Sequence, residues 1–160
     1  MKLNQIYNSL FESVKRDKSR KVLYVDKHGK NIVYDSGDYA ISINDESRAT
    51  YAILWYKEFE YQWKNVGTIR VTISKRRFKG DDDFKTYYNM DEVSIKPTHR
   101  NKGFGNALYR TIIDFAKDDI AGLFSYLPNR ANTTRVPHIY KKFGAETPED
   151  NTDYQIIRFE

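Results

Sequence analysis

The chain contains no cysteine. This excludes disulfide bonds, thiolate metal sites and a cysteine nucleophile, and it is compatible with a reducing compartment such as the cytosol. No apolar run reaches the roughly 18 residues that span a bilayer, and Met1 to Gln5 show no apolar stretch of the kind found in a secretory signal. We therefore expect a cytoplasmic protein without a membrane partner.

What the chain does contain is typical of a folded domain. Its 160 residues are 39% hydrophobic and 31% charged, which suffices for one domain with a substantial core. The net charge of +5 is compatible with nucleic acid, an acidic protein or an anionic cofactor as partner, although a solvated surface rich in lysine accounts for most of it. The 3 histidines lack the spacing of a metal site, so no bound metal is expected.

The most informative stretch runs from Met90 to Phe115. β-branched residues at period two precede Pro97, which predicts a strand that ends there. Gly103 and Gly105 then open a predicted helix. A basic loop of this kind directs backbone N–H groups and the positive end of a helix at one point, which suits a phosphate. The apolar positions of the helix are Leu108, Ile112, Phe115 and Ala116.

Periodicity predicts the remaining elements. The first part of the chain is expected to form an amphipathic helix over 3–16, hairpin strands over 21–25 and 31–34, and strands over 39–43, 50–57 and 66–74, with the aromatic segment 58–64 joining or extending the last two. After an exposed loop over 75–84 come a strand over 85–96, a helix over 105–117, a strand over 123–127, a helix from Thr133 or Thr134 to Gly144, and a strand over 154–159.

The glycine loop does not fit two widespread phosphate-binding motifs. The dinucleotide fingerprint needs a third glycine at a position where this chain has Leu108. The Gly-Lys-Ser/Thr end of a P-loop is absent. On these residues alone, an anion site and a purely structural glycine turn both stay open.

Three short motifs carry a resemblance to a known family. The run Arg100 to Gly105 is similar to the Arg/Gln-x-x-Gly-x-Gly/Ala motif of the GCN5-related N-acetyltransferases, the GNAT superfamily. Ile95-Lys96-Pro97 resembles the Val-x-Pro that ends the family's preceding strand, and Ile139 to Ala145 resembles its later Tyr-x-x-x-Gly-Phe helix end. The order of predicted elements agrees with the family over about 85–159.

The resemblance implies an α+β (α/β/α) fold with a single GNAT-like domain over 1–160. Its central sheet would be mixed, mostly antiparallel and twisted, with helices on its faces. Residues 1–35 would add a helix and hairpin, and residues 85–160 would form the acyl-CoA-binding core.

The resemblance also implies transfer of an acetyl or other acyl group from acyl-CoA to a primary amine by direct attack. The acceptor would be a protein lysine, a protein N-terminus or a small cationic amine. The pyrophosphate of CoA is expected on the loop and its pantetheine arm along the strand end. At the position where the family often has an asparagine that binds pantetheine, this chain has Thr133, so the neighbouring Asn132 is expected to take that role. The expected cofactor-binding residues are Ile95, Arg100, Asn101, Lys102, Gly103, Phe104, Gly105, Asn106 and Asn132.

Tyr140 matches the family tyrosine that protonates the departing thiolate. The base is expected on the long strand at Glu92 or Asp91. Adjacent strand residues point to opposite faces, so at most one of the two faces the site. Glu92 is preferred, and a bulge in the strand would reverse that choice. His138 is a further option, since histidine titrates near neutral pH.

Two other function classes stay open. One is a non-catalytic GNAT-like protein that binds CoA or a partner protein, and the other is an RNA-directed acyltransferase, suggested by a pI of about 9.2. We expect a monomer or homodimer.

Acidic Asp81 to Asp83, together with aromatic residues, would form a rim for a cationic acceptor. Those aromatic residues are Tyr51, Trp55, Tyr56, Phe59, Tyr61 and Trp63.

Overall fold

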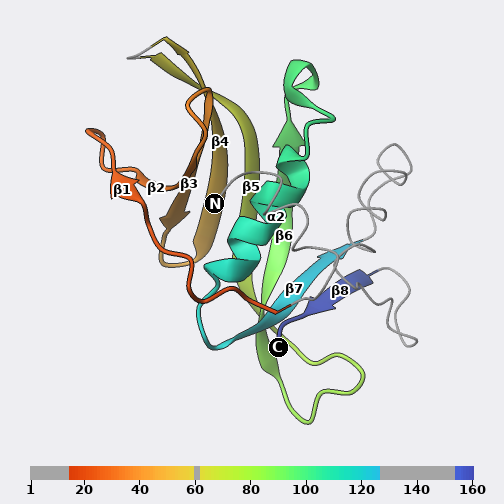
Figure 1. Cartoon of the computed structure of the whole chain (residues 1–160). Helices are drawn as coiled ribbons and strands as arrows, with labels where there is room; N and C mark the ends of the chain where they lie inside the picture. Colours follow the sequence, from red (N-terminus) through yellow and green to blue (C-terminus); the bar gives the residue numbers. More distant parts are fainter. Residues whose placement is uncertain (1–14, 60–61, 127–153) are drawn as a thin grey trace.

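Figure 1 shows the computed structural model of the chain, which describes residues 15–59, 62–126 and 154–160. The strands form one eight-stranded sheet in the sequential order β1 to β8. Every neighbouring pair is antiparallel except β6 and β7, which are parallel. This is the mixed, mostly antiparallel sheet that the sequence predicts. The elements are β1 (Tyr24–Val25), β2 (Asn31–Asp35), β3 (Tyr39–Asp45), β4 (Ala49–Phe59), β5 (Gln62–Arg76), β6 (Lys85–Ile95), η1 (Pro97–His99), α2 (Phe104–Asp114), β7 (Ile120–Tyr126) and β8 (Tyr154–Arg158).

Most predicted elements are present with somewhat different ends. Strands β4 and β5 are longer than expected, because the aromatic segment between them extends both. Helix α2 ends at Asp114 and not at Lys117. Of the helix predicted over 3–16, Lys15 and Arg16 are not helical and the rest lies outside the described residues, as does the helix predicted to end at Gly144.

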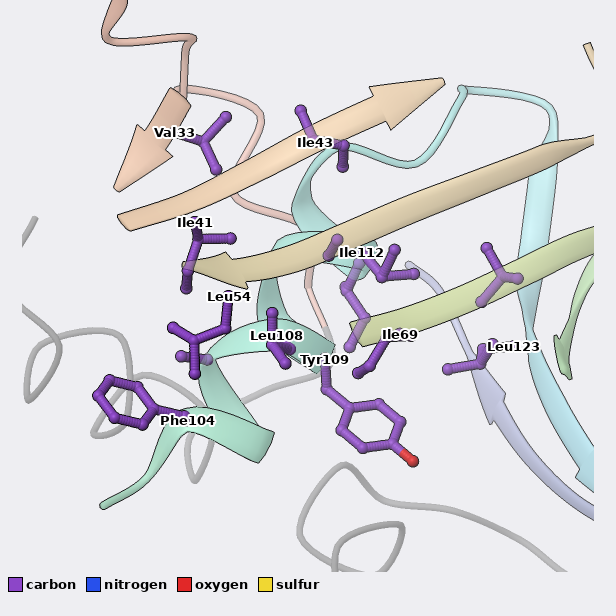
Figure 2. Packing of buried hydrophobic residues seen from close by; sticks show 14 of the residues in the cluster. Val33, Ile41, Ile43, Leu54, Ile69, Phe104, Leu108, Tyr109, Ile112 and Leu123 are labelled. Atoms are coloured by element: carbon purple, nitrogen blue, oxygen red, sulfur yellow. The ribbon is translucent and has the colours of Figure 1, made fainter. Parts of the chain in front are cut away.

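Helix α2 covers one face of the sheet, and Figure 2 shows the core between them. Every residue of α2 except Gly105 is buried. Leu108 and Ile112 are fully buried, and each such aliphatic side chain stabilises the fold by roughly 1.5–3 kcal/mol. No helix in the described ranges has the length and apolar character needed to cross a membrane. The sheet residues in this core include Ile41, Ile43, Leu54, Ile69 and Leu123.

The segment before β1 is fastened to the C-terminal end of α2. The buried carboxylate of Asp114 lies 3.0 Å from Arg110 Nε and 3.1 Å from Arg20 Nη1. It also accepts a hydrogen bond of 2.8 Å from the Asp17 N–H. Arg110 donates in addition to the Lys15 carbonyl. The N-terminal hairpin is thus joined to the core twice, through the sheet and through this buried ion cluster.

The loop predicted over 75–84 is present over 77–84 and is mostly exposed, but Phe78 and Asp81 within it are buried. β5 continues to Arg76, and Asp81 is 6% exposed. Its carboxylate accepts hydrogen bonds from the Tyr87 hydroxyl at 2.7 Å, the Phe78 N–H at 2.9 Å and Arg158 at 2.6 Å. The expected exposure of Asp81 is wrong, because its partner Arg158 comes from β8, far along the chain. Asp81 is therefore a structural ion and no part of an acidic acceptor rim.

Candidate functional site

The backbone between β6 and α2 turns through two left-handed residues. After η1, Asn101 has φ 62° and Gly103, the residue before α2, has φ 80°. A Cβ strains this conformation, so glycine suits position 103, and asparagine is among the few residues that tolerate it at 101. Left-handed residues in such turns direct successive N–H groups into a shared concavity that binds anions.

The donors of this loop are not used by the described part of the protein. The first helical bond of α2 runs from the Ala107 N–H to the Gly103 carbonyl, at 3.1 Å. Within the described residues, nothing accepts from the N–H groups of residues 101–106, and no side chain caps the helix. The exposed ammonium of Lys102 adds positive charge. This arrangement fits the phosphate groups of a nucleotide cofactor.

The side chain of Arg100 contacts the backbone of Ile95 at the end of β6. The Arg100 Nε donates to the Ile95 carbonyl at 2.7 Å, so this side chain folds back onto the end of β6. The Lys96 N–H donates to Val66 on β5. Because backbone groups alternate along a strand, the N–H and C=O of Ile95 face the other edge. Its N–H is thus the group left for a ligand.

Strands β6 and β7 part beside this loop. Their pairing runs from Thr86 to Asn89 on β6, whereas β6 stays paired with β5 as far as Ile95. In Figure 1, β7 and β8 turn away from the upper half of β6. The edge of β6 over 90–95 is therefore open among the described residues. An extended ligand can hydrogen-bond to such an edge.

The two acidic candidates share one face of β6. Arg70 on β5 pairs with Glu92 and Val71 pairs with Met90, so Asp91 is an extra residue in a bulge. The side chains of Met90 and Val93, on either side of the acidic pair, both pack into the core under α2. Asp91 and Glu92 are exposed on the opposite face. The prediction that they face opposite ways is wrong, because the bulge breaks the alternation. The expectation that a bulge would reverse the choice between them is also wrong, because the bulge places both side chains on the same face.

The two carboxylates differ in their partners. Asp91 forms an ion pair with Arg70, whose Nε donates to the Tyr51 hydroxyl at 3.1 Å. Glu92 accepts only a long hydrogen bond of 3.4 Å from the Ser94 hydroxyl among the described contacts. Glu92 is thus the carboxylate that remains available on this face.

Sequence reasoning missed two residues beside the loop, Tyr39 and His99. The Tyr39 hydroxyl lies 2.8 Å from His99 Nδ1 and 3.4 Å from the Lys102 ammonium. The only local signal was the position of His99 directly before Arg100. Its partner is 60 positions away in the chain.

Other predicted site residues fall outside this picture. Tyr140, Asn132 and His138 lie outside the described residues, so their roles stay predictions. Of the six aromatic residues predicted to form a rim for a cationic acceptor, three already contact cations of the protein, and Tyr61 lies outside the described residues. Those pairs, given as distances from the charged group to the ring centroid, are Lys30 with Trp55 at 4.8 Å, Lys57 with Trp63 at 4.8 Å and Arg70 with Tyr51 at 5.7 Å.

Comparisons with known proteins agree with this geometry. Solved structures with the same fold include Arabidopsis thaliana NAA60 with acetyl-CoA, at TM-score 0.56 and 9% identity over 71% of this chain and 77% of that chain. A mutant of the toxin AtaT, bound to the C-terminus of the antitoxin AtaR and acetyl-CoA, has TM-score 0.51 and 12% identity over 76% and 93%. No curated protein matches the sequence. Residues 6–145 match the model described as the acetyltransferase (GNAT) family, and the chain belongs to that family.

Proposed function

We propose that this chain transfers an acetyl group from acetyl-CoA to a primary amine. The observation that carries the proposal is the loop over 101–106, whose N–H groups have no acceptor among the described residues and lie at the start of α2, beside the end of β6 that leaves β7. The family membership supports the same assignment. Acetyl-CoA supplies the activated thioester, and the protein supplies binding, orientation and proton transfer.

The residues present fit acyl-CoA. The backbone of Asn101 to Asn106 would hold the pyrophosphate, with Lys102 adding charge. Gly105, the one residue of α2 that is only partly buried, would let the backbone approach the ligand closely. The N–H of Ile95, which has no acceptor among the described residues, would hold the pantetheine arm or the thioester carbonyl. Asn132 is proposed to assist on the pantetheine side.

The proposed chemistry needs two proton transfers. The neutral amine attacks the thioester carbonyl carbon, a C–N bond forms, the C–S bond breaks, and the sulfur leaves as a thiolate. Glu92 accepts the proton of the amine, directly or through water, because Asp91 is held by Arg70. Tyr140 donates a proton to the thiolate.

Calorimetric titration with CoA tests the binding half of the proposal. Gly103→Glu should abolish binding, because the side chain strains a φ of 80° and brings a negative charge to the phosphate position. Gly29→Glu is the matched control, since Gly29 has the same φ of 80° in the distant turn between β1 and β2. If folded Gly103→Glu binds CoA as well as the control does, the loop is not the cofactor site.

A screen of amines with acetyl-CoA tests the catalytic half. With an accepted amine, Glu92→Gln should lower kcat by about 10²–10⁴-fold, whereas Asp91→Asn should have a smaller effect. Tyr140→Phe should lower kcat without weakening CoA binding. A result in which Asp91→Asn is the more damaging variant would move the base to Asp91, and a fully active Tyr140→Phe would remove the proposed acid.

The net charge of +5 favours an RNA-directed acyltransferase as the second candidate. RNA binding that weakens steeply with salt would support it, since phosphate contacts release counterions. No RNA binding at low salt would eliminate it. If CoA binds but no amine is acetylated, the remaining candidate is a non-catalytic CoA-binding protein.

A further inference from the structure

Tyr39 on β3 contacts both sides of the loop between β6 and α2. Its ring centroid lies 5.6 Å from that of His99, in η1, and 4.4 Å from that of Phe104, the first residue of α2. Tyr56 on β4 packs against Tyr39 at 5.2 Å and against His99 at 5.1 Å. The ring of Tyr39 thus packs against residues at both ends of the loop, His99 and Phe104, so β3 contributes to the shape of the loop.

The hydrogen bonds of the Tyr39 hydroxyl have a preferred direction. The Lys102 ammonium has only donors, so the hydroxyl oxygen accepts from it at 3.4 Å. When the imidazole is neutral and Nδ1 has no proton, the hydroxyl donates its single hydrogen to His99 Nδ1, at 2.8 Å. In this arrangement the imidazole carries its proton on Nε2. Two donors, the ammonium of Lys102 and the Nε2–H of His99, are therefore linked through one phenol.

We propose that Tyr39 is a positioning residue that holds Lys102 and His99 as a second phosphate contact beside the N–H groups of the loop. This inference rests on the proposed function, because the phosphate is taken to be that of acyl-CoA. Lysine and histidine side chains are long or freely rotating, and a fixed partner reduces the conformational entropy that they lose when a ligand binds. Tyr39 is placed to provide that partner from a strand outside the loop.

The charges around His99 are consistent with this role. Its burial, together with Lys102 and Lys96, lowers the pKa of His99 below its ordinary value. The other groups that face it are the rings of Tyr39 and Tyr56. A bound phosphate would oppose the two lysines and favour the protonated imidazole. The Tyr39 hydroxyl would then accept from Nδ1–H, so the contact survives either protonation state.

The test compares CoA affinities of variants by calorimetry. Tyr39→Phe keeps the ring and removes the hydroxyl, and it should raise the Kd for CoA by about threefold to tenfold. With an accepted amine, the KM for acetyl-CoA should rise while kcat stays the same. Tyr24→Phe is the control, because it removes a hydroxyl that bonds Asp35 at the sheet edge. An unchanged Kd for Tyr39→Phe would overturn the inference.

The pair with His99 can be tested separately. His99→Leu should weaken CoA binding at least as much as Tyr39→Phe, and the double variant should lose less than the sum of the two single losses, because Tyr39 acts in part through His99. His99→Gln, whose amide can accept from the phenol, should retain more affinity than His99→Leu. Additive effects in the double variant would overturn the shared role, and so would equal losses for the two His99 variants.

A pH series adds a readout that a merely structural role would not move. If phosphate favours protonated His99, wild-type affinity for CoA should rise as pH falls from about 8 to about 6. His99→Gln should flatten that rise, and a profile that His99→Gln leaves unchanged would contradict the contact. If the wild type binds no CoA at all, the proposed function fails. If it binds CoA with an affinity indifferent to Tyr39 and His99, only this inference fails.

Discussion

The polar groups at the two ends of helix α2 differ in their hydrogen-bond partners. At the N-terminal end, the N–H groups over 101–106 have no acceptor within the described residues, and no acidic side chain lies in the first turn. At the C-terminal end, the carboxylate of Asp114 has donors from Arg110, Arg20 and the Asp17 N–H. One end is open to a ligand and the other is closed by the protein.

Because of this difference, one end of α2 is expected to affect ligand binding and the other end the stability of the fold. The saturated end is buried, with the Asp114 side chain 1% exposed, so removing one member leaves charge stranded away from water. At the open end, Asn101 and Lys102 are exposed to water, so their polar groups are solvated when no ligand is bound. Substitutions at the closed end should therefore change the free energy of unfolding, and substitutions at the open end should change affinity.

The largest expected effect is at the closed end. Asp114→Ala leaves Arg20 and Arg110 without their carboxylate and should lower the free energy of unfolding by about 3–5 kcal/mol, measured by urea denaturation. At a temperature where the variant is folded, its affinity for CoA should stay within about twofold of wild type. A large loss of affinity in folded Asp114→Ala would mean that the two ends are coupled.

The second prediction concerns Asp81, another saturated carboxylate. Burial opposes its ionisation, yet hydrogen bonds from Tyr87 and Arg158 leave the pKa of Asp81 below its ordinary value. Its contribution is therefore present above the unfolded pKa of about 3.8 and is lost as pH falls through the folded pKa. Asp81→Asn should cost about 1–3 kcal/mol at pH 7 and less at pH 3, in denaturation series at both values. A difference that does not shrink in acid would contradict the assignment.

The third prediction gives stability and affinity opposite signs. Gly105 lies in the first turn of α2 without a left-handed φ, so alanine fits its conformation. Gly105→Ala should stabilise the fold by about 0.5–1 kcal/mol, seen as a higher Tm. It should also raise the Kd for CoA by about tenfold, because a Cβ enters the phosphate position. A higher Tm together with an unchanged or lower Kd for CoA would mean that the ligand binds elsewhere.

The smallest effect is expected from the exposed charge at the open end. Lys102→Ala should weaken CoA binding by about threefold at low salt and by less at high salt, since exposed charges are screened. Lys27→Ala in the β1–β2 turn changes the net charge equally and should leave the affinity as it is. Equal effects of the two variants would indicate a general charge effect and no local contact.

Local signals were enough for the elements around the site. β-branched alternation before Pro97, the glycines at 103 and 105, and the helical spacing from Leu108 to Ile112 predicted β6, the loop and α2. These features depend on residues that are neighbours in the chain. The glycine loop was located correctly and its family was identified correctly because both depend on such short runs of residues.

Features that depend on distant partners were not predictable in this way. The bulge at Asp91 is fixed by the register between β5 and β6, which a single strand does not reveal. The burial of Asp81 needs Arg158 from the last strand. The contact of His99 with Tyr39 requires β3 to lie beside the loop, which follows only from the order of the sheet.

The sequence by itself determined where an anion-binding turn forms, because glycine at 103 and proline at 97 restrict the backbone locally. Only the tertiary structure decided which groups near that turn are free. In the folded protein, Asp91 forms an ion pair with Arg70, the Ile95 carbonyl accepts from Arg100, and the Tyr39 hydroxyl hydrogen-bonds to His99. The same fold leaves Glu92 and the loop N–H groups over 101–106 without strong partners among the described residues, because hydrogen bonds are assigned in space and not along the chain.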